Sequence, residues 1–279
     1  MNADVSNAIR IALLKEGMLL APTYGFKSEC LFAAAKRSLS LNSNFVHFNC
    51  VNSANFAQLF PRGFPIAVIE NILMKSNADS LVHLEQCFSK NAILNNVAKH
   101  TEPHKYVDFT LPSVKNVVVE AMDTKICSLV PFAPHWFEAT SLECLPSNVP
   151  HAARYSIEFI DSVCYYAERV KRLKQIILSG KIVSDSGVSD FVSVSSNSRS
   201  LDDSSFIKPG AETVWKSFAL VAPLSSAPVR GGILDCEWYA LRFKVASVFS
   251  LCMLSFLGDK SYNHKHTREM AKSIINTLF

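Results

Sequence analysis

Apolar and polar positions follow two different patterns along the first half of the chain. Segments with helical spacing of apolar residues are separated by short, wholly apolar runs, which are typical of buried strands. Helices are predicted over 6–16, 28–39 and 78–96, and the apolar runs lie at 18–20, 45–48, 66–69 and 117–119. This alternation favours an α/β fold with a mainly parallel central sheet over about 1–150.

The second half of the chain predicts helices and one loop. A long helical face is formed by Ile157, Ile160, Cys164, Ala167, Val170, Leu173 and Ile177. The opposite face carries a basic strip, Arg169, Lys171, Arg172 and Lys174. We interpret this strip as a solvated helix face rather than a site for an acidic partner. The serine- and aspartate-rich stretch at 182–206 is predicted to be a flexible loop, and further helices are expected after Ala211.

The composition is that of a globular protein. Of the 279 residues, 49% are hydrophobic and 19% charged, and the formal charge of +4 does not by itself indicate binding to nucleic acid or a membrane surface. The eight cysteines form no CxxC pair, which favours reduced core thiols of an intracellular protein over a zinc site. The longest apolar stretch, 245–258, is shorter than the ~20 residues of a membrane span, so a buried helix is expected there.

Residues 17–37, GMLLAPTYGFKSECLFAAAKR, contain an incomplete phosphate-loop motif. In G-x-x-x-x-G-K-[ST], backbone amides approach the phosphates, the lysine reaches the outer phosphates and the hydroxyl binds Mg²⁺. Ala21 and Phe26 stand where the glycines belong, and a surface turn with an incidental lysine is the commoner explanation of such a match. The predicted nucleotide-binding residues are Pro22, Thr23, Gly25, Phe26, Lys27, Ser28, Glu70 and Asn71.

The run FPIAVIEN at 64–71 has the form of a Walker B strand, in which an acid follows four apolar residues. In that role Glu70 and Ser28 would hold Mg²⁺, and Asn71 would replace the glutamate that polarises the attacking water. The cofactor would then be ATP or ADP with Mg²⁺. The alternative is an ordinary buried strand that ends in a polar turn.

Three later segments follow one another in a specific order. NADSLVHLEQCFSKNAIL (77–94) is similar to a helix with a W-[IV]-E-x-[LM]-N core, and LPSVKNVVVEAMDTKICS (111–128) is similar to an E-x-x-D strand. VFSLCMLSFLGDKSYNHKHTREMAKSI (248–274) is similar to a lid-side helix with a downstream arginine. The matching positions are Glu120, Asp123, Ser128, Phe249, Ser250, Leu251 and Arg268. Together these segments resemble the AAA+ modules of dynein heavy chains, most closely the second module of the ring.

The resemblance implies a fold, a location and partners. The fold would be a three-layer P-loop AAA+ core with a mainly parallel sheet over 1–150, followed by a helical lid region over 151–279. The implied role is microtubule-based movement in the cytoplasm, the cytoskeleton, or a cilium or flagellum. The implied partners are adjacent AAA+ modules or dynein-type subunits, with microtubules only indirectly, no membrane, and nucleic acid disfavoured.

The sequence departs from the family at the catalytic positions. The family's V-S-R-C-G arginine has no counterpart, because residues 131–139 read PFAPHWFEA with Pro134 near its place. Loss of this arginine, both loop glycines and the catalytic glutamate argues against efficient hydrolysis. We therefore expect a structural or weakly ATP-binding module without catalytic residues. The alternatives are an active ATPase with an atypical phosphate loop and a basic RNA- or DNA-binding protein such as a viral nucleoprotein.

Overall fold

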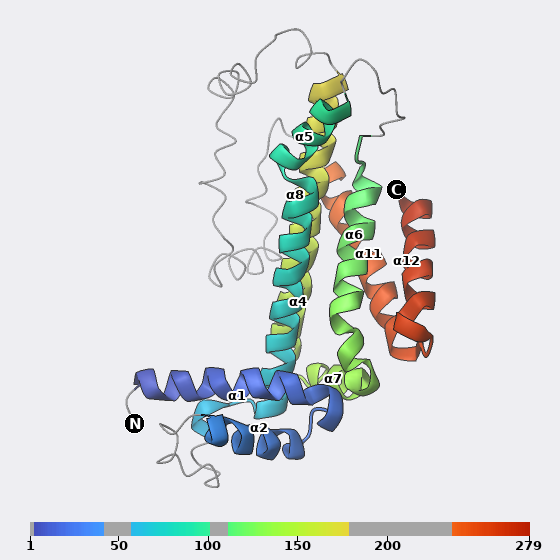
Figure 1. Cartoon of the computed structure of the whole chain (residues 1–279). Coiled ribbons are helices and arrows are strands. Elements are labelled where there is room, and N and C mark those ends of the chain that lie inside the picture. Colours follow the sequence, from blue (N-terminus) through green and yellow to red (C-terminus); the bar gives the residue numbers. More distant parts are fainter. Residues whose placement is uncertain (1–2, 42–56, 101–110, 179–235) are drawn as a thin grey trace. The chain divides into compact units, whose positions relative to one another are not determined.

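The regular structure of the chain is helical. The computed structural model describes residues 3–41, 57–100, 111–178 and 236–279, and 89% of this part is helix with no strand. The helices are α1 (Ala3–Tyr24), α2 (Ser28–Leu41), α4 (Phe64–Phe88), α5 (Lys90–His100), α6 (Val114–Leu129), α7 (Trp136–Glu143), α8 (Val149–Leu178), α11 (Cys236–Gly258) and α12 (Lys265–Leu278) (Figure 1). Two short 3-10 turns, η2 (Val130–His135) and η5 (Tyr262–His264), precede α7 and α12.

The predicted α/β fold is wrong for the described part of the chain. The apolar runs at 18–20, 66–69 and 117–119 lie inside α1, α4 and α6, and the run at 45–48 lies outside the described residues. The three-layer AAA+ core predicted over 1–150 is therefore absent from this part. The helices predicted over 28–39 and along the 157–177 face are confirmed by α2 and α8. The predicted loop at 182–206 also lies outside the described residues.

The valine run shows why the strand prediction failed. Val117 and Val118 begin a series of buried positions that continues at helical spacing through Ala121, Met122 and Ile126, all at most 1% exposed. A strand would instead bury alternate residues. Three adjacent valines favour a strand by local propensity, but the helical burial pattern over sixteen residues of α6 decides the structure.

The described residues belong to two compact units. Unit 1 contains residues 1–82, 122–157 and 250–272, and unit 2 contains 83–121, 158–249 and 273–279. Both units draw residues from either side of position 150. Helices α4, α6, α8, α11 and α12 each contribute residues to both units.

Unit 1 contains a hairpin of α1 and α2, which lie against each other (Figure 1). Gly17 in α1 lies close to α4 side chains, because a Cβ there would lie 2.6 Å from Phe64 Cζ and 2.9 Å from Val68 Cγ2. Both of these α4 side chains are buried. The absence of a side chain at residue 17 thus lets the two helices pack closely.

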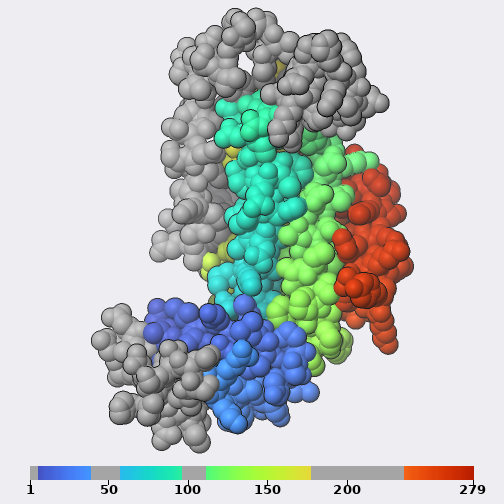
Figure 2. Space-filling view, viewed as in Figure 1, coloured from blue at the N-terminus to red at the C-terminus, as the bar shows by residue number. Residues whose placement is uncertain are grey.

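Unit 2 is held by contacts of α8 with the first part of α11. The Arg242 Nε atom lies 3.0 Å from Asp161 Oδ1, and its Nη1 atom lies 3.4 Å from Glu168 Oε1. The same guanidinium lies 3.5 Å from the centre of the Trp238 ring. Charge pairing and cation–π contact therefore fix one arginine between two helices. In both units α6 also contacts α12, and their side chains meet on the face shown in Figure 2.

Gly17→Ala is expected to destabilise the protein by about 1–3 kcal/mol, because the added methyl group overlaps Phe64 and Val68 in a packed core. Urea denaturation followed by circular dichroism measures the loss. The matched control is Gly258→Ala in α11, where an added Cβ meets nothing within 4 Å. The control should be neutral or slightly stabilising, since alanine is the better helix former. Equal losses in both variants would contradict the close approach at Gly17.

Candidate functional site

The predicted phosphate loop is a turn between two helices. α1 continues through Pro22 and Thr23 to Tyr24, and Gly25 follows it with a left-handed φ of 69°. The Gly25 N–H donates to the Ala21 carbonyl at 2.9 Å, which is the hydrogen bond of an αL helix C-cap. Gly25 therefore ends a helix, where the prediction had placed it in a loop after a strand.

Phe26 follows Gly25 in the same turn, and its side chain packs into the core of unit 1. Its side chain is 4% exposed, and its ring meets that of Trp136 edge-on at 6.3 Å. Its backbone N–H donates to Glu138 Oε2 at 3.3 Å. The Glu138 carboxylate thus accepts the Phe26 N–H that a bound phosphate would need. Its negative charge would also repel the phosphate. Lys27 and Ser28 are exposed beside this turn.

The predicted Walker B residues are in the first half of α4. Glu70 Oε2 accepts a hydrogen bond from Arg62 Nη2 at 2.8 Å, and Glu70 Oε1 forms an ion pair with Arg62 Nη1 at 2.7 Å. Asn71 Nδ2 lies 3.2 Å from the sulfur of Met18. The acid that was expected to hold Mg²⁺ is therefore paired with a cation. Binding of ATP or ADP with Mg²⁺ stays a prediction.

A buried lysine forms a polar centre in unit 1. Lys125 of α6 is 2% exposed, and its Nζ donates to Ser76 Oγ at 2.5 Å and to Asn77 Oδ1 at 2.6 Å, both on α4. Ser76 Oγ donates in turn to the Leu73 carbonyl at 3.0 Å. The amine is thus held by two oxygen acceptors in an otherwise apolar core, as a buried donor requires.

The centre extends to a third helix. Asn77 Nδ2 donates to the Tyr155 carbonyl of α8 at 2.9 Å, and Ser80 Oγ donates to the Ser76 carbonyl at 2.8 Å. Asn77 therefore bonds to α6 through its oxygen and to α8 through its nitrogen. One amide side chain fixes the relation of three helices within unit 1.

Two ionisable groups of this centre titrate near neutral pH. Burial lowers the pKa of Lys125 to about 7, and the negative charge of Glu143 opposes that shift. Burial also raises the pKa of Glu143 to about 7; Lys125 opposes this rise and Glu70 adds to it. A buried amine and a nearby carboxyl thus compete for a proton near pH 7.

A serine next to a lysine of lowered pKa is also the pair found in Ser–Lys hydrolases. Such a site needs the serine oxygen to reach a substrate. Ser76 and Lys125 are each only 2% exposed, and the Ser76 hydroxyl proton is directed to a backbone carbonyl. The geometry therefore supports a role for this centre in helix packing rather than in nucleophilic attack.

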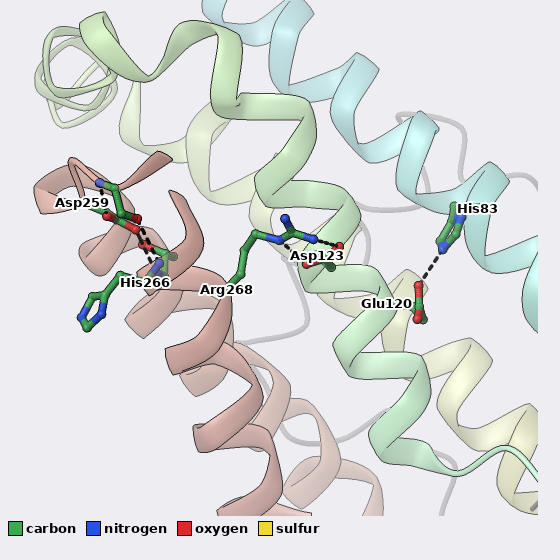
Figure 3. Close-up of polar contacts among 8 residues, drawn as sticks. His83, Glu120, Asp123, Asp259, His266 and Arg268 are labelled. Atoms are coloured by element: carbon green, nitrogen blue, oxygen red, sulfur yellow. Dashed lines mark hydrogen bonds and ion pairs between the residues drawn. The ribbon is translucent and has the colours of Figure 1, made fainter. Parts of the chain in front are cut away.

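Unit 2 holds a cysteine, a histidine and a glutamate close together. His83 Nε2 lies 2.9 Å from Glu120 Oε2 (Figure 3) and 3.7 Å from Cys87 Sγ. A catalytic relay needs the acid and the nucleophile on opposite ring nitrogens, whereas here both approach the same one. Burial and the charge of Glu120 raise the pKa of Cys87, which disfavours the thiolate. In the described ranges no group of three or more such side chains is placed to hold a metal ion.

The structure pairs two residues from separate segments of the family resemblance. Arg268 Nε and Nη2 bind Asp123 Oδ1 and Oδ2 at 2.5 and 2.8 Å, which forms a bidentate ion pair between α12 and α6 (Figure 3). This hydrogen-bonded pairing raises the pKa of Arg268. Ser128, a third matching residue, donates its hydroxyl to the Lys125 carbonyl at 2.8 Å. These residues join helices, and the expected E-x-x-D strand is part of α6.

The basic strip predicted on α8 is partly paired within unit 2. Arg169 Nη1 lies 3.5 Å from Glu85 Oε2, and Lys171 Nζ lies 2.7 Å from Glu237 Oε2. Two of the four positive charges are therefore next to carboxylates of the same chain. This pairing weakens the strip as a surface for nucleic acid, which requires free positive charges.

α11 is apolar on two opposite faces. Val245, Val248, Cys252 and Phe256 are at most 2% exposed, so the predicted buried helix at 245–258 has a buried face. Its other face is exposed, including Phe243 at 75% and the leucines at 251 and 254 at 46% and 66%. Among the described residues, α11 alone is long and apolar enough to span a bilayer, and 22% of its most apolar stretch is buried. An exposed apolar face of this kind indicates a binding surface.

No protein-family model matches the chain, and no curated protein matches it.

The buried lysine centre was not predicted from the sequence. Lys125, Ser76 and Glu143 are common surface residue types, and none belongs to a recognised motif. One signal was present: Lys125 and Ser76 fall on the buried faces of α6 and α4 at helical spacing from their apolar neighbours. The strand prediction for 66–69 and 117–119 hid that spacing.

Lys125→Met is expected to destabilise the protein more at pH 8 than at pH 5. The variant leaves the Glu143 carboxyl without its cation, and this carboxyl has a raised pKa of about 7. The Glu143 carboxyl is neutral at pH 5. At pH 8 the folded variant must either bury its negative charge or keep it protonated above its pKa, and both cost stability. In the wild type the amine, with its pKa lowered to about 7, carries its buried charge fully at pH 5. Both effects have the same sign, and the expected loss at pH 8 is about 3 kcal/mol.

Denaturation at pH 5 and pH 8 measures these losses. Lys115→Met in the same helix is the control, because Lys115 Nζ makes only an exposed contact, 3.2 Å from the Asn276 carbonyl. The control should change stability by less than about 0.5 kcal/mol at either pH. If Lys125→Met lost the same stability at both pH values, the buried pair would not titrate as described.

Proposed function

We propose that this protein is a non-catalytic helical scaffold that works by binding another macromolecule through the outer face of α11. The observation that carries the proposal is the apolar character of α11 on both faces. Val245 and Cys252 on one face are buried inside the protein, whereas Phe243 and Leu254 on the other face are exposed to water. Each such side chain gains about 1.5–3 kcal/mol when a partner covers it.

The reactive groups of the described residues support a scaffold because internal contacts occupy them. Lys125 and Ser76 bond to each other inside the core, and Glu70 pairs with Arg62. Buried thiols point the same way, since burial raises the pKa of Cys30 and Cys252 to about 11. These groups stabilise the fold and are not presented to a substrate.

A protein surface suits the exposed face of α11 better than a bilayer does. The Ser255 and Thr267 hydroxyl oxygens lie 3.1 Å apart and join α11 to α12. α12 carries charged side chains, including exposed Glu269 and Lys272. Inserting α11 into lipid would carry such charges toward hydrocarbon, which is costly. No contact of the described residues identifies the partner, so association with dynein-type subunits stays a prediction.

The scaffold proposal predicts that the chain does not bind nucleotide through the former phosphate loop. A fluorescent ATP analogue with Mg²⁺ should show no saturable binding, because Glu138 occupies the Phe26 amide and Phe26 fills the core. Lys27→Ala should behave as the wild type. Micromolar binding that disappears in Lys27→Ala would identify a working nucleotide site and contradict the proposal.

Photo-cross-linking in cells tests the binding face directly. A benzoyl-phenylalanine placed at Phe243 or at Leu254 should give cross-linked products of defined mass, because both positions lie on the outer face of α11. The matched control is the same replacement at Phe137 of α7, which is exposed to a similar extent, 73% against 75% for Phe243. No product from α11, or the same products from Phe137, would overturn the proposed face.

A further inference from the structure

The exposed face of α11 carries an uncharged stripe with heptad spacing. Its positions are separated alternately by three and four residues, the spacing of the seam between two packed helices. They are Ala240, Phe243, Ser247, Ser250, Leu254 and Leu257. Because α11 is one continuous helix, helical geometry alone places these six side chains on one face, over about 26 Å. The buried Val245 and Cys252 lie on the opposite side.

The order of side-chain sizes along the stripe is nearly the same in both directions. The two serines occupy the middle, and Phe243 and Leu254 flank them at equal distances. At the ends, small Ala240 corresponds to large Leu257. A helix of this pattern is complementary to a second copy of itself that runs in the opposite direction.

We propose that α11 forms an antiparallel homodimer with α11 of a second copy of this chain. This inference rests on the proposed function and names the partner. In the dimer Phe243 faces Leu254 of the second copy, and Ser247 faces Ser250. The small central serines let the helices approach closely, and the large side chains close both ends of the contact.

The serine side chains can enter this contact at low cost. The Ser247 hydroxyl already donates to the Phe243 carbonyl of its own helix at 2.8 Å. Its hydrogen bond therefore survives when water is excluded. Ser250 faces Ser247 of the second copy in the proposed pairing, so its hydroxyl has an oxygen acceptor near it.

An antiparallel arrangement is favoured over a parallel one by charge. Lys244 is exposed in the first part of α11. A parallel pair would bring both copies of this cation to the same end. The antiparallel pair separates them along the helix and also aligns the two helix dipoles favourably. The isologous contact is closed, so it predicts dimers rather than filaments.

Sedimentation velocity on the full chain tests the proposal. The wild type at about 100 µM should sediment with twice the chain mass of 30.9 kDa. Phe243→Lys alone and Leu254→Glu alone should each raise the dissociation constant at least about tenfold, because each places a charge in the apolar contact. Phe137→Lys is the matched control and should leave the dimer unchanged.

The double variant Phe243→Lys, Leu254→Glu distinguishes the two arrangements. In the antiparallel dimer each introduced lysine faces the introduced glutamate of the other copy, so association should recover most of the tenfold loss. Within one chain the two positions are three helical turns apart and cannot pair. In a parallel dimer like charges would face each other, and the double variant would remain dissociated, which would overturn the proposal.

Two further outcomes would overturn the dimer and separate its failure from that of the proposed function. A monomeric wild type whose Phe243 position still cross-links to another protein in cells would leave the scaffold proposal standing with a different partner. A monomeric wild type that sediments with phosphatidylcholine vesicles, and loses this in Phe243→Lys, would assign the face to lipid. Recovery of the dimer in the double variant also excludes misfolding as the cause of the single-variant losses.

Discussion

The amine of Lys125 is a strong hydrogen-bond donor inside the core of unit 1, and the surrounding helices are arranged to accept its protons. Ser76 and Asn77 supply the acceptors from one turn of α4, and Asn77 extends the network to the α8 backbone. An apolar contact tolerates small shifts between helices, whereas hydrogen bonds to a buried amine require a fixed geometry. The relation of these helices within unit 1 therefore depends on Lys125 together with Asn77.

The same centre carries a cost that the fold must offset. Burial lowers the pKa of Lys125 and raises the pKa of Glu143, so the folded state disfavours the charge on each. Their mutual attraction only partly compensates, as is usual for buried ion pairs. The apolar side chains on either side of the amine, such as Ile69, Met122 and Leu129, supply the remaining stabilisation. Hydrogen bonds of the polar residues thus fix the arrangement of the helices, and burial of neighbouring apolar residues on the same helices stabilises it.

α11 shows the opposite situation, in which apolar surface is left over. Its buried face contributes Val248 and Phe256 to the interior, and the latter stacks on His264 at 4.3 Å between ring centres. The stripe from Ala240 to Leu257 on its exposed face carries no polar side chain apart from two serines. A helix that is apolar all round is normally enclosed completely. In the described part of the chain α11 is enclosed on one face only, which is why we propose its other face as the binding surface.

The sequence alone determined the elements whose helical spacing is uninterrupted. α2 and α8 were predicted because their buried positions are filled by apolar residues such as Cys164, Ala167 and Val170. Gly25 and Phe26 could be recognised as an unusual turn, although their use as a helix cap and a core residue depends on Ala21, Trp136 and Glu138.

Only the tertiary structure decided that the first half of α4 and all of α6 are helical and that Lys125 is their shared centre. Ser76, Ser80 and Lys125 occupy buried positions, so the apolar pattern along the chain shrinks to short runs that resemble strands. A polar residue can take a core position when an acceptor or donor meets it from another helix, and this partner is remote in sequence. Residues 76 and 125 are 49 positions apart, and no local pattern reports that they form a hydrogen bond. The physical reason is that burial of a polar group is a property of a pair, whereas a sequence pattern describes its members one at a time.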